Sequence, residues 1–296
     1  MVEAGAYPTY LTTSEVAESA PARRALLDCL ANGVAEIGAH FHTWTRTWPF
    51  ETPALGDPPL QAMAHQLGQQ IEERMLSYTC AALVKAFGRP PTSYRGGRWS
   101  LGRESTRSLI NCGIEVDSTV TPGLTWADSS SRLVDGPDYR CARRGPYWLE
   151  GPEGHSQVLE IPVGAAWFPS AGRRLPPFPR RVLSKVRRLA GLRGGHCWLR
   201  PTRVSVSDMR ATMESLKSDG IPVWVFMIHS SEIVPCQPLS THRDVDAFVD
   251  RCIGAIRCAI ELGAEPATLT EAARWLKQSL PRPPARTTAA SATVQT

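Results

Sequence analysis

Short apolar runs recur along the chain, and longer segments with apolar residues at helical spacing separate them. Runs of four to eight residues rich in Val, Ile, Tyr and Thr are typical of strands. Six segments have this pattern: 6–12, 34–42, 92–99, 114–120, 158–163 and 223–229. An alternation of strands and helices repeated this often favours a mainly parallel α/β sheet or barrel over a sandwich.

The helices expected between these strands have recognisable ends. Thr12 and Glu15 predict a capping box at one helix start, and Asn32-Gly33 predicts its end. A longer helical region is expected over about 60–87. Three further starts combine an N-cap residue with an acidic one: Ser207-Asp208, Thr241 to Asp244 and Thr268 to Glu271.

The chain of 296 residues, 42% of them apolar, is long enough to bury a full core. We expect one α/β domain over 1–279, including a basic helical segment at 173–200. Residues 280–296 lack a periodic apolar pattern, which predicts a disordered tail.

No run of eighteen apolar residues predicts a membrane span, and the first residues do not resemble a signal peptide. The cytoplasm is therefore the expected location. The eight cysteines form no CxxC pair and no zinc-finger spacing, which indicates reduced thiols rather than a disulfide framework.

Polar side chains gather where the predicted strands end. In parallel α/β folds the carboxyl ends of strands collect the chemistry, so we expect these residues to lie near one another. They are His40, His42, Arg95, Arg98, Asp117 and His229.

The stretch EIGAHFHTW places His40 and His42 two residues apart on one predicted strand. Side chains two apart share a face of a strand, so both imidazoles can reach one cation. The alternative is a pair of histidines that hydrogen-bond locally. A lone histidine such as His229 is more often a satisfied residue near the core, but its company at strand ends favours a site.

Five segments in order resemble the polysaccharide deacetylase superfamily, the NodB-homology carbohydrate esterases. EIGAHFHTW is similar to the family's metal-histidine motif and PTSYRGGRWSLG to its arginine motif. GIEVDSTVTP and LEIPVG resemble the next two strands, and VFMIHSSEIVP resembles the last motif, whose histidine is catalytic. The resemblance runs from about Tyr7 to Ala273.

This resemblance implies a deformed (β/α) barrel that hydrolyses N-acetyl groups of an amino sugar or glycan with a divalent metal, usually zinc. By position, His40 and His42 would bind the metal and His229 would protonate the leaving amine. Arg95 would orient the base or the acetate, while Trp99, Arg98 and Asp117 would contact substrate. Such chemistry needs a Lewis acid, a base and an acid.

The chain departs from the family pattern in two places. The usual second metal histidine would fall at Trp44, so His42 is the substitute. The paired aspartates of the family's first strand are absent, which predicts a barrel missing its first strand and helix. We therefore expect either that Met1 is an internal start or that the protein is a decayed, inactive relative.

Nine Lys or Arg residues and no acidic residue lie between Arg173 and Arg200. The plain interpretation is a helix with a solvated basic face; the alternative is contact with an anionic membrane surface or a charged glycan. No nucleic-acid motif accompanies the charge. The function hypotheses are thus a deacetylase, a non-catalytic carbohydrate-binding relative that stacks sugars on aromatics such as Trp44, Trp48, Trp99 and Trp126, and a membrane-peripheral protein.

Overall fold

The structure is a computed structural model of the whole chain. It describes residues 1–44, 48–52, 63–102, 104–127, 136–151, 158–168, 195–202, 204–236 and 239–282.

Six strands form the main sheet, in the order β1-β2-β3-β4-β6-β5. They are β1 (Thr9–Thr12), β2 (Glu36–Phe41), β3 (Ser93–Gly96), β4 (Val116–Asp117), β5 (Tyr147–Trp148) and β6 (Leu159–Glu160). All neighbouring pairs are parallel except β5 and β6. A second sheet is an antiparallel pair, β7 (Ala165–Phe168) with β8 (Gly195–Trp198).

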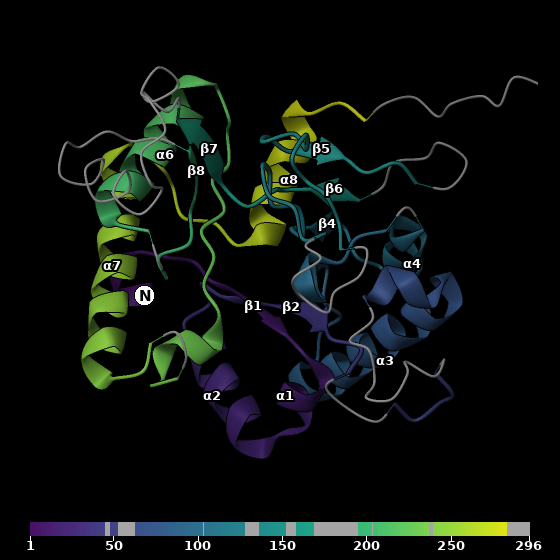
Figure 1. Cartoon of the computed structure of the whole chain (residues 1–296). Helices are drawn as coiled ribbons and strands as arrows, with labels where there is room; N and C mark the ends of the chain where they lie inside the picture. The colour runs from purple at the N-terminus through teal and green to yellow at the C-terminus, as the bar shows by residue number, and fades with distance from the viewer. Residues whose placement is uncertain are drawn as a thin grey trace, which may run out of the picture.

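The helices pack on both sides of the strands (Figure 1). In that view α3 and α4 lie to one side of β1 and β2, α6 and α7 lie to the other, and α8 lies beside β4 and β6. The α-helices are α1 (Ser14–Glu18), α2 (Ala20–Leu30), α3 (Gln69–Phe87), α4 (Ser105–Asn111), α6 (Val206–Ser218), α7 (His242–Glu261) and α8 (Leu269–Ser279). The 3-10 turns are η1 (Val2–Ala4), η2 (Ala64–Leu67), η3 (Gly97–Trp99) and η5 (Ser230–Ile233).

Apolar faces of the helices explain this packing. Met75, Leu76 and Leu83 of α3 are at most 1% exposed and pack in one cluster with Phe41 of β2 and Tyr94 of β3. A second cluster joins the apolar face of α8 to β4 and β6, and a third joins α6 to α7. Removing these side chains from water is the main source of the folding free energy.

Helix α8 closes the amino-terminal end of the sheet. The backbone N–H of Leu269 donates to Thr9 Oγ1 at the start of β1, at 2.9 Å. The N–H of Thr270 donates to the carboxylate of Glu36 at the start of β2, at 3.2 Å. Because this end is occupied, the opposite end, where the strands finish, is the one open to a site.

The mainly parallel α/β sheet confirms the expected class of fold. Closure into a barrel is not confirmed, because β1 and β5 are the two edges of the sheet within the described residues. The predicted sixth strand is wrong as a strand: residues 223–229 are extended but make only one bridge, Val225 with Val163.

Helix boundaries also differ in places. The first N-cap is Thr13 rather than Thr12, and α6 begins after Ser205, whose hydroxyl accepts from the N–H of Asp208. The N-caps at Thr241 and Thr268 are confirmed, each as a capping box. The region predicted helical from about 60 contains η2 and then α3, which ends at a left-handed Gly88 as expected.

The predicted basic helix does not reach residue 200, because Gly195–Trp198 is strand β8. Its residues 173–194 lie outside the described residues. The predicted tail begins later than expected: the carbonyl of Leu280 accepts from Trp148 Nε1 at 3.3 Å, and Arg282 lies over the same ring. Residues 283–296 lie outside the described residues.

Candidate functional site

His40 and His42 meet at the carboxyl end of β2. His40 Nδ1 donates to the carbonyl oxygen of Arg95 on β3, at 2.7 Å, because a carbonyl can only accept. The neutral His40 ring therefore carries its lone pair on Nε2. His42 Nε2 lies 3.1 Å from that atom, so it donates to His40. The parallel register that places His40 opposite Arg95 builds this arrangement.

Both imidazoles are held neutral. The pKa of His40 is lowered to about 3, mainly by burial and to a lesser extent by the neighbouring His42. Burial, followed by the charge of Arg98, lowers the pKa of His42 to about 4. At neutral pH both rings are therefore uncharged, which is the state that a histidine metal ligand needs.

The histidine pair fits a metal ion in part. Two imidazole nitrogens on one tetrahedral zinc lie about 3.3 Å apart, from Zn–N bonds of about 2.05 Å. The observed separation of 3.1 Å is close to this value. Binding through both Nε2 atoms requires the His42 proton to move to Nδ1. In the described part of the chain no third His, Cys, Asp or Glu completes a metal-binding group.

Loop Gly96–Trp99 forms one wall of the site and carries backbone strain. Arg98 and Trp99 both have positive φ, 51° and 62°, which is uncommon for residues with a side chain. The two glycines permit the fold of the loop. A Cβ on Gly96 would lie 2.0 Å from the Ser100 carbonyl oxygen, and one on Gly97 would lie 2.2 Å from the Phe41 carbonyl oxygen.

Hydrogen bonds keep this loop in place. The N–H of Gly96 binds Thr119 Oγ1 at 2.8 Å, and the Tyr139 hydroxyl donates to the Trp99 carbonyl at 2.7 Å. Strained residues that their surroundings fix in this way are typical of functional loops.

Arg95 is buried and bonds to the residue that follows β4. Its Nε donates to the Ser118 carbonyl at 2.6 Å and its Nη2 to the Ser118 hydroxyl at 2.9 Å. Burial lowers its pKa to about 10, while the negative charge of Asp117 and Glu160 acts in the opposite direction. The side chain thus anchors β3 to the segment after β4, and its carbonyl orients His40.

Asp117 lies beneath the site, not in it. It is 0% exposed, as is Glu160, its register partner on β6. Asp117 Oδ1 accepts from Thr119 and Glu160 Oε1 accepts from the Val120 N–H, which leaves Oδ2 and Oε2 buried without another donor. A hydrogen bond joins the two carboxyl groups, and burial raises the pKa of both. They therefore share a proton, and Asp117 acts on Arg95 through its charge.

His229 faces the pair from another element. It is the N-cap of η5, and its Nδ1 accepts from the Ser231 N–H at 3.3 Å, so the neutral ring carries its proton on Nε2. Its backbone N–H donates to Glu232 at 2.8 Å, and Glu232 pairs with Arg200 at 3.1 Å. His229 is exposed, and its charge lowers the pKa of both His40 and His42.

The aromatic residues predicted to stack on sugars divide into two groups. Trp48 is 7% exposed and donates to the Thr43 carbonyl, so it belongs to the core. Trp44 lies under the Arg98 guanidinium, 4.3 Å from the ring centre. Trp99 is also 7% exposed and belongs to the core, where it stacks on the partly exposed Trp126 with ring centres 5.7 Å apart. Trp198, which the sequence did not single out, contacts both of these rings.

One carboxylate near the histidines was missed. Glu15, on the helix directly after β1, is partly exposed and raises the pKa of His42 against the stronger effect of burial. The strand-end rule that selected His40 also applies to Glu15, three residues after Thr12.

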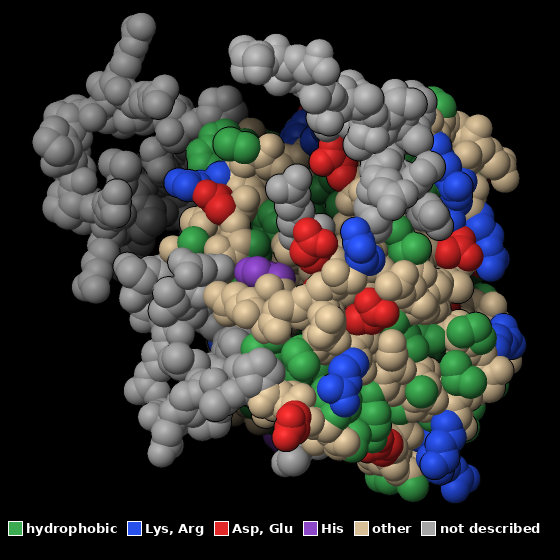
Figure 2. Space-filling view, turned by 90° about the vertical axis from the view of Figure 1, so that its right-hand side faces the viewer, with side chains coloured by type: hydrophobic (Ala, Val, Ile, Leu, Met, Phe, Trp, Pro, Cys, Tyr) green, Lys and Arg blue, Asp and Glu red, His purple; other side chains and the backbone are tan. Residues whose placement is uncertain are grey.

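The structure thus brings His40, His42, Arg95, Arg98 and His229 to one end of the sheet and places Asp117 below them. On the face shown in Figure 2, basic and acidic side chains are interspersed over the described part, with no large patch of one sign. No helix among the described residues is both long and apolar enough to cross a membrane.

The chain shares its mixed α/β fold, with a mostly parallel sheet, with two solved structures. It aligns with a crystal structure titled "putative polysaccharide deacetylase" from Mycobacterium smegmatis, with a TM-score of 0.54 and 17% identity over 97% of this chain and 78% of that one. It also aligns with a 4-alpha-glucanotransferase from Thermococcus litoralis, with a TM-score of 0.51 and 15% identity. That alignment covers 93% of this chain and 34% of the other. No protein-family model and no curated protein matches the sequence.

Proposed function

We propose that the protein is a hydrolase of the polysaccharide deacetylase type, which removes N-acetyl groups from an amino sugar or glycan. The observation that carries the proposal is the meeting of His40, His42 and His229 at the end of a parallel sheet. The likeness in fold to a protein titled as a polysaccharide deacetylase supports it.

His40 and His42 are proposed as two ligands of a divalent cation, with zinc as the first choice. Their neutral state and the 3.1 Å separation of their Nε2 atoms support this role. When bound, such an ion polarises an acetyl carbonyl and acidifies water. The Arg95 carbonyl holds His40 in the tautomer that presents Nε2.

His229 is the proposed general acid. An amine leaves an acyl carbon only when it is protonated, and the exposed His229 imidazole is the proposed source of that proton. Glu232 and Ser231 orient the backbone and ring of His229. Glu15 is the proposed base, because its charge acts on His42 and it follows β1 at the same end of the sheet.

Acetate release from chitin oligosaccharides, with and without added zinc, tests this function. Wild-type protein is expected to release acetate, and His40→Ala and Glu15→Gln to lose at least 10²-fold in rate. His242→Ala is the matched control, because His242 is an exposed histidine at the start of α7. Zinc content should fall in His40→Ala and not in the control.

A second candidate is glycan binding without turnover. The partly exposed Trp44 and Trp126, two of the aromatic residues predicted to stack on sugars, favour it. Binding of the same oligosaccharides without acetate release at any zinc concentration would select this candidate. The predicted contact of segment 173–200 with an anionic membrane surface stays a prediction.

A further inference from the structure

Two thiols meet where the end of α4 packs against α3. Cys80 lies in the middle of α3, and Cys112 is the C-cap of α4, 32 positions later. A hydrogen bond joins their side chains. Both are free and partly exposed. Their spacing in the sequence gave no hint of this contact.

The surroundings give the two thiols different roles. Cys112 Sγ lies 3.2 Å from the Ser77 hydroxyl, and the hydrogen bond from Cys80 followed by that of Ser77 lowers its pKa. The same bond to Cys112 raises the pKa of Cys80. The polar contacts of Cys112 with the Ser77 hydroxyl and the Glu73 carbonyl favour Cys112 as the nucleophile, because the thiolate is the reactive form of cysteine, and leave Cys80 as its protonated neighbour.

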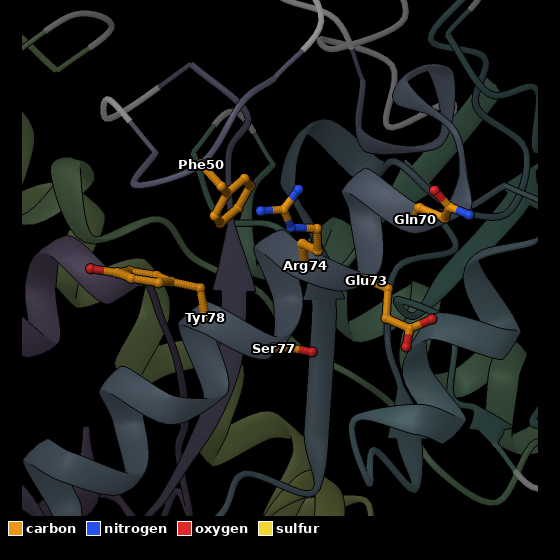
Figure 3. A pocket seen from close by; sticks show the side chains of 6 residues that line it. All are labelled: Phe50, Gln70, Glu73, Arg74, Ser77 and Tyr78. Carbon is orange, nitrogen blue, oxygen red and sulfur yellow. The ribbon is translucent and has the colours of Figure 1, made fainter.

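A cavity of about 540 Å³ opens beside this pair and is lined by Phe50, Gln70, Glu73, Arg74, Ser77 and Tyr78. Figure 3 shows the Arg74 side chain rising from α3 toward the Phe50 ring, and the Ser77 and Glu73 side chains on the same helix. Ser77 and Glu73 also contact Cys112, through the Ser77 hydroxyl and the Glu73 carbonyl. A small oxidant entering this cavity therefore comes within reach of Cys112.

We propose that Cys112 is a site of oxidation by hydrogen peroxide and that Cys80 resolves the product into an intramolecular disulfide. The Cys112 thiolate attacks one peroxide oxygen, the O–O bond breaks, and the departing hydroxide takes a proton to become water. Cys80 sulfur then attacks the Cys112 sulfenic acid, and its proton leaves with the sulfenic hydroxyl as a second water. Both sulfurs are oxidised and the peroxide is reduced.

The disulfide would enclose the segment that builds the candidate site. The residues between the two cysteines include β3 and the strained loop of Arg98 and Trp99. A cross-link over a loop of this length restricts the unfolded chain. The oxidised protein is expected to melt about 5–10 °C higher than the reduced protein.

Peptide mapping of the full chain after brief treatment with hydrogen peroxide tests the proposal. Mass spectrometry of wild-type protein is expected to find a peptide pair linked through Cys80 and Cys112, lighter by two hydrogen atoms and restored by dithiothreitol. A missing Cys80–Cys112 link, with other cysteines oxidised instead, would overturn the proposal.

The Cys80→Ser variant separates the two steps, since it cannot resolve the sulfenic acid. A dimedone probe is expected to label Cys112 in this variant at least about tenfold faster than Cys141, an exposed cysteine that serves as the internal control. Faster labelling of Cys141 would show that exposure alone governs oxidation. The wild-type disulfide map still decides the matter if Cys80→Ser folds poorly.

Discussion

The site region contains two pairs of like ionisable groups in opposite surroundings. His40 on β2 pairs with His42 just after that strand, and Asp117 on β4 pairs with Glu160 on β6. His40 and His42 lie at the rim, where one nitrogen of each faces the other at 3.1 Å. Asp117 on β4 lies two strands away and Glu160 on β6 three strands away, and both are 0% exposed. Burial keeps the histidines neutral and keeps one proton on the carboxyl pair.

The two pairs therefore have different proposed roles: the histidines take part in the reaction, and the two carboxyl groups stabilise the fold. The two histidines are joined by a hydrogen bond between their Nε2 atoms, which a ligand bound to these atoms would replace. The carboxyl pair satisfies its own oxygens with a shared proton and holds a charge under Arg95. Substitutions of the histidines at the strand ends should therefore change the turnover rate. Substitutions of the buried carboxyl groups should change the free energy of unfolding.

The largest expected effect is on turnover at the rim. His229→Gln keeps the size of the side chain but cannot donate a proton to the leaving amine, so deacetylation should slow about 10³-fold. Because His229 is exposed, the free energy of unfolding should change by less than about 0.5 kcal/mol. Steady-state kinetics and urea denaturation check the two parts. An unchanged kcat would remove His229 from the mechanism.

The next effect concerns the interior pair. Asp117→Ala leaves Glu160 without its partner and Arg95 without a nearby charge, so the free energy of unfolding should fall by about 4 kcal/mol. Asp117→Asn retains a hydrogen-bonding group toward Glu160 and should cost about 1 kcal/mol. Urea denaturation of the three proteins measures both values. Equal midpoints for wild type and Asp117→Ala would show that the carboxyl pair does not support the sheet.

The sequence predicts this separation only in part. Alternating strands and helices predict the parallel sheet, and capping residues such as Thr241 and Thr268 predict helix starts, because these signals are local. The strand-end rule places His40, Arg95 and His229 together. It does not distinguish a rim residue from a buried one, so Asp117 is expected at the surface and is 0% exposed.

Other features depend on contacts between distant segments. Glu160 matters only because the β4–β6 register sets it opposite Asp117. Segment 223–229 has a strong strand pattern, but among the described residues its one β-bridge pairs Val225 with Val163, so no ladder forms. The thiol pair depends on how α3 packs on α4. No local pattern encodes these pairings.

A third buried carboxyl group, that of Glu72, lowers the free energy of unfolding as the pH rises. Burial raises the pKa of Glu72 to about 7, against an unfolded value of 4.5, although the Ser105 hydroxyl donates to it at 2.7 Å. The folded state thus holds this proton more tightly, and the stability it confers is lost as pH rises through 7. Between pH 4.5 and pH 8 wild type should lose about 3 kcal/mol relative to Glu72→Gln. Urea denaturation at the two pH values measures this difference, and parallel curves would contradict the assignment.

The smallest effect lies on the acid side, where the rim histidines act in the opposite direction. The pKa of His40 is lowered to about 3 in the folded state, below its ordinary 6.5, so the unfolded chain binds a proton first as pH falls. Stability present above pH 6.5 is therefore lost below it, by about 2 kcal/mol between pH 7 and pH 5 for this one group. His40→Gln should flatten that slope by this amount in chelator-treated protein, and His42→Gln should do so to a similar extent. If the free energy of unfolding of wild type and of His40→Gln changed equally between pH 7 and pH 5, the folded protein would protonate His40 as readily as the unfolded chain does. The contrast with the buried Asp117–Glu160 pair would then not hold.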